Sequence, residues 1–186
     1  MSQEVKKVTL PLTDEVIREL KAGMNVLLNG EMLVARDAAH KRIVEALDRG
    51  EKPPVELNGQ TIYYMGPAPA KPGKVIGAAG PTTSGRMDVY TPRLLQEGLK
   101  GMIGKGERTI EVQDAIREHH AVYFAAIGGA GALLSKRIKE VRILAYEDLG
   151  AEALRLIRVE DFPVVVICDM HGGNLYEEGK RTYAKR

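Results

Sequence analysis

Hydroxyl side chains and a cation are concentrated in one short stretch near the middle of the chain, Gly80-Pro81-Thr82-Thr83-Ser84-Gly85-Arg86-Met87-Asp88. Thr82, Thr83 and Ser84 stand between two glycines, and Arg86 follows directly. Hydroxyls, backbone N–H groups and a guanidinium group are the donors that bind a carboxylate or a phosphate. The same composition is typical of surface turns, so these residues alone predict either an anion-binding loop or an ordinary turn.

Two further cations stand where a ligand could reach them. Arg36 follows an apolar run and precedes an expected helix, and such strand-to-helix junctions often carry ligand-facing residues in α/β proteins. Lys105 lies between two glycines, which have no side chains to keep a ligand away. A solvated arginine and a surface turn are the alternatives. Neither Gly104-Lys105-Gly106 nor Gly128-Gly129-Ala130-Gly131 matches a nucleotide-binding fingerprint.

The elements that must position these residues are predicted from apolar periodicity, caps and breakers. Strands are expected over 5–10, 60–65, 74–79, 100–103, 121–127, 141–145 and 162–169, with a hairpin around Asn29-Gly30. Helices are expected over 14–21 (capped by Thr13), 37–50 (capped by Asp37), 112–119, 130–138 and 147–157, and from Thr91 onward. Strands and helices alternate roughly, which predicts an α/β or mixed layered domain.

Length and composition predict one globular domain over residues 1–186. The 186 residues are 44% hydrophobic and 28% charged, with residues 177–186 forming a polar, frayed tail. The formal net charge of +2 does not suggest a nucleic-acid or membrane partner. No apolar run approaches the roughly 20 residues that span a bilayer. Residues 1–7 lack a signal-peptide core, so a cytoplasmic location is expected.

No metal site is expected on this chain. Cys168 is the single cysteine, and it ends an apolar run that reads as a buried strand. An iron–sulfur cluster usually takes three or four thiolates, which one cysteine cannot supply. The four histidines, His40, His119, His120 and His171, do not have metal-ligand spacing.

Five separated segments, taken in order, resemble the β subunit (C-terminal half) of class I, iron–sulfur-dependent fumarases. They are residues 35–42, 80–88, 104–106, 128–133 and 160–163. The same family includes L-tartrate dehydratase. The resemblance runs through most of the chain, and its first two segments are specific.

The resemblance implies an α/β fold, a single layered domain of the swivelling β/β/α type with a mixed sheet. It implies a hydro-lyase that reversibly hydrates fumarate to (S)-malate and is inactive without a fumarase α subunit. That partner would hold a [4Fe-4S] cluster on three cysteines, with one open iron acting as a Lewis acid. The hetero-oligomer would consist of αβ pairs that dimerise further.

Site residues also follow from the resemblance. Arg36, Arg86 and Lys105 would bind the dicarboxylate, with Thr83 as a hydrogen-bonding neighbour. Thr82 matches the position proposed as the base, and the acid would come from the α subunit. Two alternatives stay open: an L-tartrate dehydratase β subunit, and a non-catalytic module that binds dicarboxylates or other anions.

Overall fold

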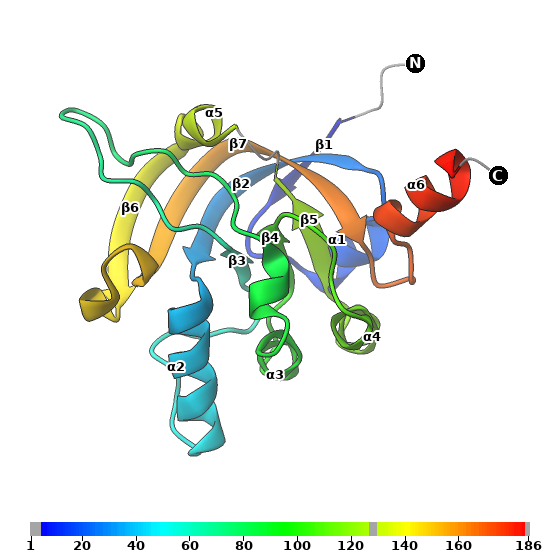
Figure 1. The fold of residues 1–186 in the computed structure, drawn as a ribbon, viewed down its shortest axis with the longest axis horizontal. Helices are drawn as coiled ribbons and strands as arrows, with labels where there is room; N and C mark the ends of the chain where they lie inside the picture. The colour runs from blue at the N-terminus through cyan, green and yellow to red at the C-terminus, as the bar shows by residue number, and fades with distance from the viewer. Residues whose placement is uncertain (1–4, 127–129, 185–186) are drawn as a thin grey trace.

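Two long antiparallel strands, β2 (Asn25–Val34) and β7 (Leu154–Cys168), form the centre of the fold. The computed structural model describes residues 5–126 and 130–184 (Figure 1). The two strands pair from Asn25 opposite Val165 to Val34 opposite Arg155. Every other strand attaches to this pair directly or through one neighbour.

The remaining strands close the sheet into a ring. β1 (Val5–Thr9) and β3 (Thr61–Tyr63) lie parallel to β2 on its free edge. β6 (Ile138–Ala145) and β5 (Val122–Ala125) lie antiparallel to β7 on its free edge. β4 (Gly101–Gly104) joins β3 to β5 through parallel pairing. Because β2 also pairs with β7, strands β2, β3, β4, β5 and β7 form a small barrel-like closed ring.

Helices are short and lie outside this ring. The α-helices are α1 (Asp14–Glu19), α2 (Asp37–Asp48), α3 (Thr91–Gln96), α4 (Ile110–Glu118), α5 (Gly131–Ser135) and α6 (Leu175–Tyr183). Two 3-10 segments, η1 (Ser84–Met87) and η2 (Glu147–Glu152), complete the described elements. Helices α2, α3 and α4 gather on one side of the sheet (Figure 1). No described helix has the length and apolar character needed to cross a membrane.

The core has two parts because successive strand residues point to opposite faces. In β2, Met32 and Val34 belong to one apolar cluster, and Leu33 belongs to the other. The second cluster includes the apolar stripes of α2, α3 and α4, so these helices cover one face of the sheet. This packing fixes the strand ends from which the predicted site residues emerge.

The predicted hairpin at Asn29-Gly30 is wrong. Both residues lie inside the continuous strand β2, opposite β7. The pairing register shifts between Leu28 and Gly30, and Gly30 has φ +115°. A Cβ at Gly30 would come 3.0 Å from the Leu10 carbonyl oxygen. The glycine therefore allows a bulge beside a close backbone neighbour, and not a turn.

The predicted helix over 147–157 is also wrong. The six-residue η2 ends at Glu152, and β7 begins at Leu154. Gly150 interrupts the helical backbone with φ +57°. From Leu154 onward β7 has pairing partners on both edges, and this long-range pairing overrides the weak local helix signal.

The structure differs from the predictions at two other segments. Residues 74–79 do not form a strand but one limb of an extended arm, residues 66–79, in which the Ala68 N–H donates to the Ala78 carbonyl. The tip of the arm projects from the domain (Figure 1). Residues 74–79 pair with no strand among the described residues, although Ile76 and Ala79 are buried in the core. Residues 177–183 of the segment expected as a frayed tail belong to α6, which Asn174 caps by accepting from the backbone N–H groups of Tyr176 and Glu177.

Other expectations are confirmed. Thr13 caps α1 by accepting from the Val16 N–H, and Arg36 stands between β2 and α2. The mixed α/β domain is as expected, whereas the swivelling β/β/α type remains a prediction. Part of the predicted glycine run, Gly128-Gly129, lies outside the described residues.

Candidate functional site

The predicted site residues lie where parallel strands end. Strands β2, β3 and β4 run in the same direction, so their carboxyl ends meet at one edge of the ring. β2 ends at Val34, shortly before Arg36, and β4 ends at Gly104, directly before Lys105. The sheet thus brings two predicted cations to one edge.

The 80–88 loop reaches the same edge and pairs with Lys105. Thr83 forms a parallel bridge with Lys105. The Ser84 N–H donates to the Lys105 carbonyl over 2.9 Å, and the Lys105 N–H donates to the Thr82 carbonyl over 3.3 Å. The structure therefore brings Thr82, Thr83 and Lys105 together.

Both predicted arginines lie beside the carboxylate of Asp37. Its Oδ1 is 3.7 Å from Arg36 Nε, and its Oδ2 is 3.8 Å from Arg86 Nη1. Asp37 is therefore not the helix cap expected from the sequence. Arg36 occupies the N-cap position of α2, without a side-chain capping bond, and the Asp37 carboxylate lies near the two guanidinium groups instead.

The reactive groups of this site are open to a ligand. The Thr83 and Lys105 residues are exposed, and Thr82 is half-buried. Within residues 5–126 and 130–184, the hydroxyls of Thr82 and Thr83 make no hydrogen bond, and the Lys105 ammonium group makes no ion pair. Hydroxyl and ammonium donors are thus left available for an anion.

Buried hydrogen bonds hold the 80–88 loop. The Thr82 N–H donates to the Tyr64 carbonyl over 2.7 Å. The Tyr123 hydroxyl donates to the Gly106 carbonyl over 2.8 Å and lies 2.9 Å from Ser84 Oγ. A Cβ at Gly104 would collide with Ser84 Oγ, so the glycine before Lys105 lets the loop approach the strand end.

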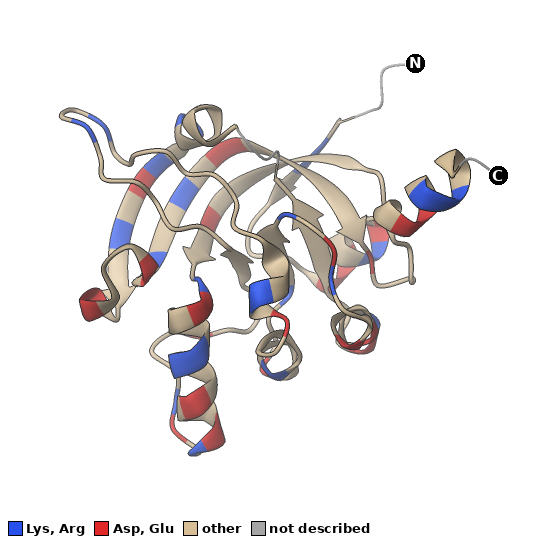
Figure 2. Ribbon diagram, viewed as in Figure 1, with Lys and Arg blue, Asp and Glu red and all other residues tan. Residues whose placement is uncertain are grey.

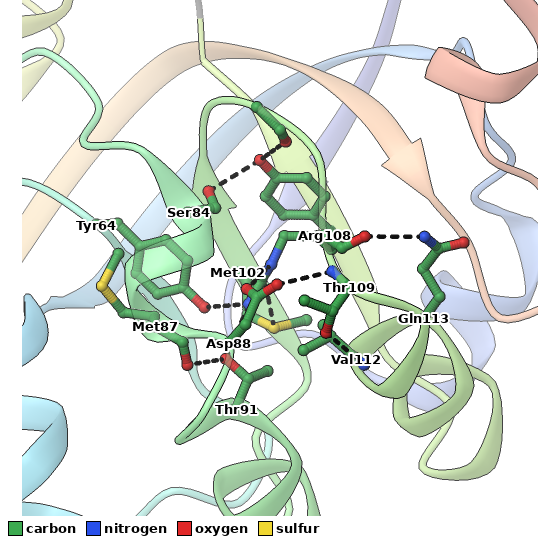
Figure 3. Close-up of polar contacts among 12 residues, drawn as sticks. Tyr64, Ser84, Met87, Asp88, Thr91, Met102, Arg108, Thr109, Val112 and Gln113 are labelled. Atoms are coloured by element: carbon green, nitrogen blue, oxygen red, sulfur yellow. Dashed lines mark hydrogen bonds and ion pairs between the residues drawn. The ribbon is translucent and has the colours of Figure 1, made fainter.

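A buried ion pair anchors the end of the loop. Arg108 Nε donates to Asp88 Oδ1 over 2.6 Å, and the two side chains are 0% and 5% exposed. The Thr109 N–H donates to Asp88 Oδ2 over 2.7 Å, and Arg108 Nη2 donates to Thr91 Oγ1 over 2.8 Å (Figure 3). The Arg108 guanidinium also lies 4.8 Å from the centre of the Tyr123 ring.

The Asp88–Arg108 pair was not predicted from the sequence. Asp88 ends the predicted loop, but Arg108 is one of 27 Lys and Arg residues and has no local feature that distinguishes it. Its role depends on the contact with Asp88, which the fold creates. The only available signal was the charged residue at the end of the motif.

His40 holds the backbone of Arg36. Its Nδ1 lies 2.8 Å from the Arg36 carbonyl, and its ring packs edge-on against Tyr64 at 5.3 Å. Burial lowers the pKa of His40 to about 4, so the ring is neutral near pH 7. A neutral ring with its proton on Nδ1 donates to the Arg36 carbonyl and fixes the start of α2.

The residues of this chain do not fit an iron–sulfur cluster. Burial raises the pKa of the Cys168 thiol to about 12, so this single cysteine is not a thiolate at neutral pH. In the part of the chain that the structure describes, no group of three or more His, Cys, Asp or Glu side chains could hold a metal ion.

Among the described residues, one large cavity is lined by none of the predicted site residues. Its volume is about 610 Å³, and it separates the 66–79 arm from α5 and β6. Its lining includes Val75, Ile76, Ala132 and Ile138, with Lys74 and Lys136 among them. Figure 2 shows acidic and basic residues interspersed along α2 and β6, so these surfaces do not form a face of one charge.

Known proteins similar to this chain support the resemblance found in the sequence. The chain is 41% identical over 170 residues to fumarate hydratase 2 of Leishmania major, covering 89% of this chain and 30% of the relative. It is 40% identical over 161 residues to the aerobic class I fumarate hydratase of Escherichia coli K12, and the match covers 86% of this chain and 29% of that relative. The chain thus spans about 30% of the length of these fumarate hydratases.

A third relative has nearly the same length as this chain. It is a Methanocaldococcus jannaschii protein provisionally named L(+)-tartrate dehydratase subunit β, 38% identical over 181 residues. The match covers 94% of this chain and 93% of that protein. Residues 1–179 match the family described as Fumarase C-terminus. The chain therefore belongs to the Fumarase C-terminus family.

Proposed function

We propose that this chain is the β-type part of a two-chain iron–sulfur hydro-lyase that reversibly hydrates fumarate to (S)-malate. One observation carries the proposal. Three segments far apart in the sequence bring Arg36, Arg86, Lys105, Thr82 and Thr83 to one edge of the ring. These are the residues that the fumarase resemblance assigns to the site.

The cations of the site suit a small dicarboxylate. The two guanidinium groups can each donate two parallel hydrogen bonds to a carboxylate, and Lys105 adds a compact positive charge. The exposed Thr83 hydroxyl adds a neutral donor. Because Asp37 contacts both arginines only at 3.7–3.8 Å, a substrate carboxylate can make shorter bonds to them.

Thr82 is the proposed base for the proton at C3 of malate. A threonine hydroxyl is a weak base at neutral pH, but nearby cations favour its ionised form. Lys105 stands directly beside Thr82 in the structure, and Arg86 follows it in the same loop. The partial burial of Thr82 strengthens the attraction of these cations, which must also offset the desolvation cost of the ionised hydroxyl.

The rest of the active site is proposed to lie on an α-type partner. That chain would hold the [4Fe-4S] cluster and supply the acid, because this chain lacks the thiolates for a cluster. This chain would then act as the swivelling domain that docks on it, within αβ pairs that dimerise further. The assembly is expected to be cytoplasmic.

L-tartrate dehydration is the second candidate. The observation that favours it is the relative named as a tartrate dehydratase β subunit, which matches this chain over nearly the whole length of both. Tartrate has a second hydroxyl, and the open hydroxyls of Thr82 and Thr83 could accommodate a further hydrogen-bonding group. Substrate kinetics separate the two candidates.

The test is an anaerobic assay of the chain with its partner. The chain is purified with the cysteine-rich protein that accompanies it in its host, and fumarate absorbance is followed after adding malate. We expect fumarate formation that needs both proteins and is lost in air. A complex that turns over tartrate but not malate would favour the second candidate. A lone chain that binds malate but gives no turnover with any such partner would indicate a non-catalytic binding module.

A further inference from the structure

Arg36 is contacted by a carboxylate from a distant part of the chain. Glu152 Oε1 lies 3.2 Å from Arg36 Nε. Glu152 is the last residue of η2, the segment that links β6 to β7 (gold in Figure 1). Nothing in the sequence around either residue indicates this contact, because the closed ring brings η2 beside α2.

A second, exposed ion pair joins η2 to α2. The Asp148 carboxylate accepts from both terminal nitrogens of Arg42, with 2.8 Å between Oδ1 and Nη1. The Arg42 guanidinium also lies 5.3 Å from the centre of the Tyr146 ring. Segment η2 therefore presents two carboxylates to α2: the exposed Asp148 to Arg42, and the partly buried Glu152 to Arg36.

Arg36 is confined on several sides. Glu152 and Asp37 lie near its Nε, and its Nη1 would be 2.7 Å from a Cβ at Gly66. Its side chain is 24% exposed. Among the described residues, Arg36 Nε and Asp37 Oδ1 are buried without a hydrogen bond. The contact with Glu152 is thus an ion pair without an aligned hydrogen bond.

We propose that Glu152 is a positioning residue for Arg36. Its carboxylate orients the guanidinium group, so that the terminal nitrogens of Arg36 stay available for a substrate carboxylate. Asp37 adds a second negative charge and links Arg36 to Arg86. The inference rests on the proposed function, since Arg36 is a predicted substrate-binding residue. It extends the site to a segment that the predicted motifs do not include.

The first test uses the full chain alone. Proton–nitrogen NMR spectra resolve arginine Nε–H groups, and Arg36→Lys identifies the Arg36 signal by its loss. We expect Glu152→Gln to shift the Arg36 signal, because the charge beside Nε is removed. Asp148→Asn is the matched control on the same segment, and it should leave the Arg36 signal in place. An unchanged Arg36 signal in Glu152→Gln would overturn the proposal.

The second test uses the assembled enzyme and a double-mutant cycle. We expect Glu152→Gln to raise KM for malate about fivefold with kcat nearly unchanged, since an oriented binding contact is lost. Asp148→Asn should leave both constants at the wild-type values. In an Arg36→Lys background, Glu152→Gln should have no further effect on KM.

The outcomes separate this inference from the proposed function. In one outcome the wild-type enzyme is active, but Glu152→Gln raises KM by the same factor whether position 36 is Arg or Lys: this result would show a merely structural role for Glu152 and overturn the inference. A wild-type complex that turns over neither malate nor tartrate would refute the proposed function. In that case the NMR comparison of Glu152→Gln with Asp148→Asn still decides whether Glu152 orients Arg36.

Discussion

Two aspartates at the candidate site, Asp88 and Asp37, contact arginines with different geometries. Arg108 and Asp88 are buried and bonded at 2.6 Å, and the second oxygen of Asp88 accepts from the Thr109 backbone. Arg36 and Arg86 approach Asp37 at 3.7–3.8 Å, and buried Asp37 Oδ1 has no hydrogen bond among the described residues.

The difference in geometry indicates that the buried pair stabilises the fold, whereas the loosely paired arginines are suited to binding. A buried pair with aligned hydrogen bonds leaves no capacity for a ligand, and breaking it leaves an uncompensated charge. The loosely paired arginines retain donors that a substrate carboxylate can use. The Arg108–Asp88 pair fixes where the 80–88 loop ends. The loose contacts of Asp37 leave Arg86 in the loop and Arg36 before α2 available to bind an anion.

The largest expected effect comes from breaking the buried pair. Asp88→Asn keeps the shape of the side chain but leaves Arg108 charged and buried, and we expect a loss of about 3–5 kcal/mol in the free energy of unfolding. Urea denaturation measures this loss. The control is Asp148→Asn, which removes an exposed pair and should cost less than about 1 kcal/mol. Equal losses in the two variants would contradict the anchoring role of Asp88.

Changing the loosely held Arg86 should leave stability nearly unchanged and reduce activity strongly. Arg86→Gln removes a half-exposed guanidinium group, so we expect a change of less than about 1 kcal/mol in unfolding free energy. In the assembled enzyme kcat/KM should fall about 100-fold, because a charged contact to the substrate is lost. Arg93→Gln, which removes another surface arginine of the chain, serves as the control. A stable Arg86→Gln variant with wild-type kinetics would remove Arg86 from the site.

A smaller effect is expected at the hydroxyl that joins the loop to the strand end. Tyr123→Phe leaves the ring in place but removes the bonds to Ser84 and to the Gly106 carbonyl. The buried Ser84 hydroxyl and the partly buried Gly106 carbonyl then lose this partner, which should cost about 1–3 kcal/mol of unfolding free energy. Thermal denaturation of the wild-type chain and of Tyr123→Phe checks this value. Tyr183→Phe, at an exposed position, should cost nothing measurable.

The pH dependence of stability should report the neutral His40. Its pKa is about 4 in the folded chain against a reference value of 6.5, so the unfolded chain binds the extra proton between these values. Stability from this residue is complete above pH 6.5 and falls as the pH decreases toward 4. Between pH 7 and pH 5.5 the loss should be about 1 kcal/mol.

The His40→Asn variant isolates this contribution, because Asn can still donate to the Arg36 carbonyl but does not titrate. Denaturant curves at pH 7 and pH 5.5 should show a smaller loss of stability in the variant. Identical losses in both proteins would mean that His40 is not held neutral by the fold.

Local patterns predicted the parts of the fold that depend on neighbouring residues. The Thr13 cap, the strand ends before Arg36 and Lys105, and the buried Cys168 follow from residue type and periodicity. Candidate site residues came from motif resemblance, which indicates chemistry without geometry. Their assembly at one edge depends on parallel pairing among β2, β3 and β4.

Long-range contacts were not predictable in the same way. Gly30 gives the same local signal in a turn and in a bulge, and only pairing with β7 distinguishes them. The helix signal after Glu147 was outweighed by strands on both edges of β7. Similarly, Arg108 and Glu152 are ordinary charged residues until the closed ring places them beside Asp88 and Arg36.

Turnover of the assembled enzyme with Thr82 altered tests whether this site carries the reaction. Wild type, Thr82→Ala and Thr82→Ser are each combined anaerobically with the α-type partner, and fumarate formation from malate is measured. If Thr82 is the base, kcat should fall at least about 100-fold in Thr82→Ala, with unchanged unfolding free energy and partial recovery in Thr82→Ser. A Thr82→Ala complex with wild-type kcat would contradict the assignment of the reaction to this site.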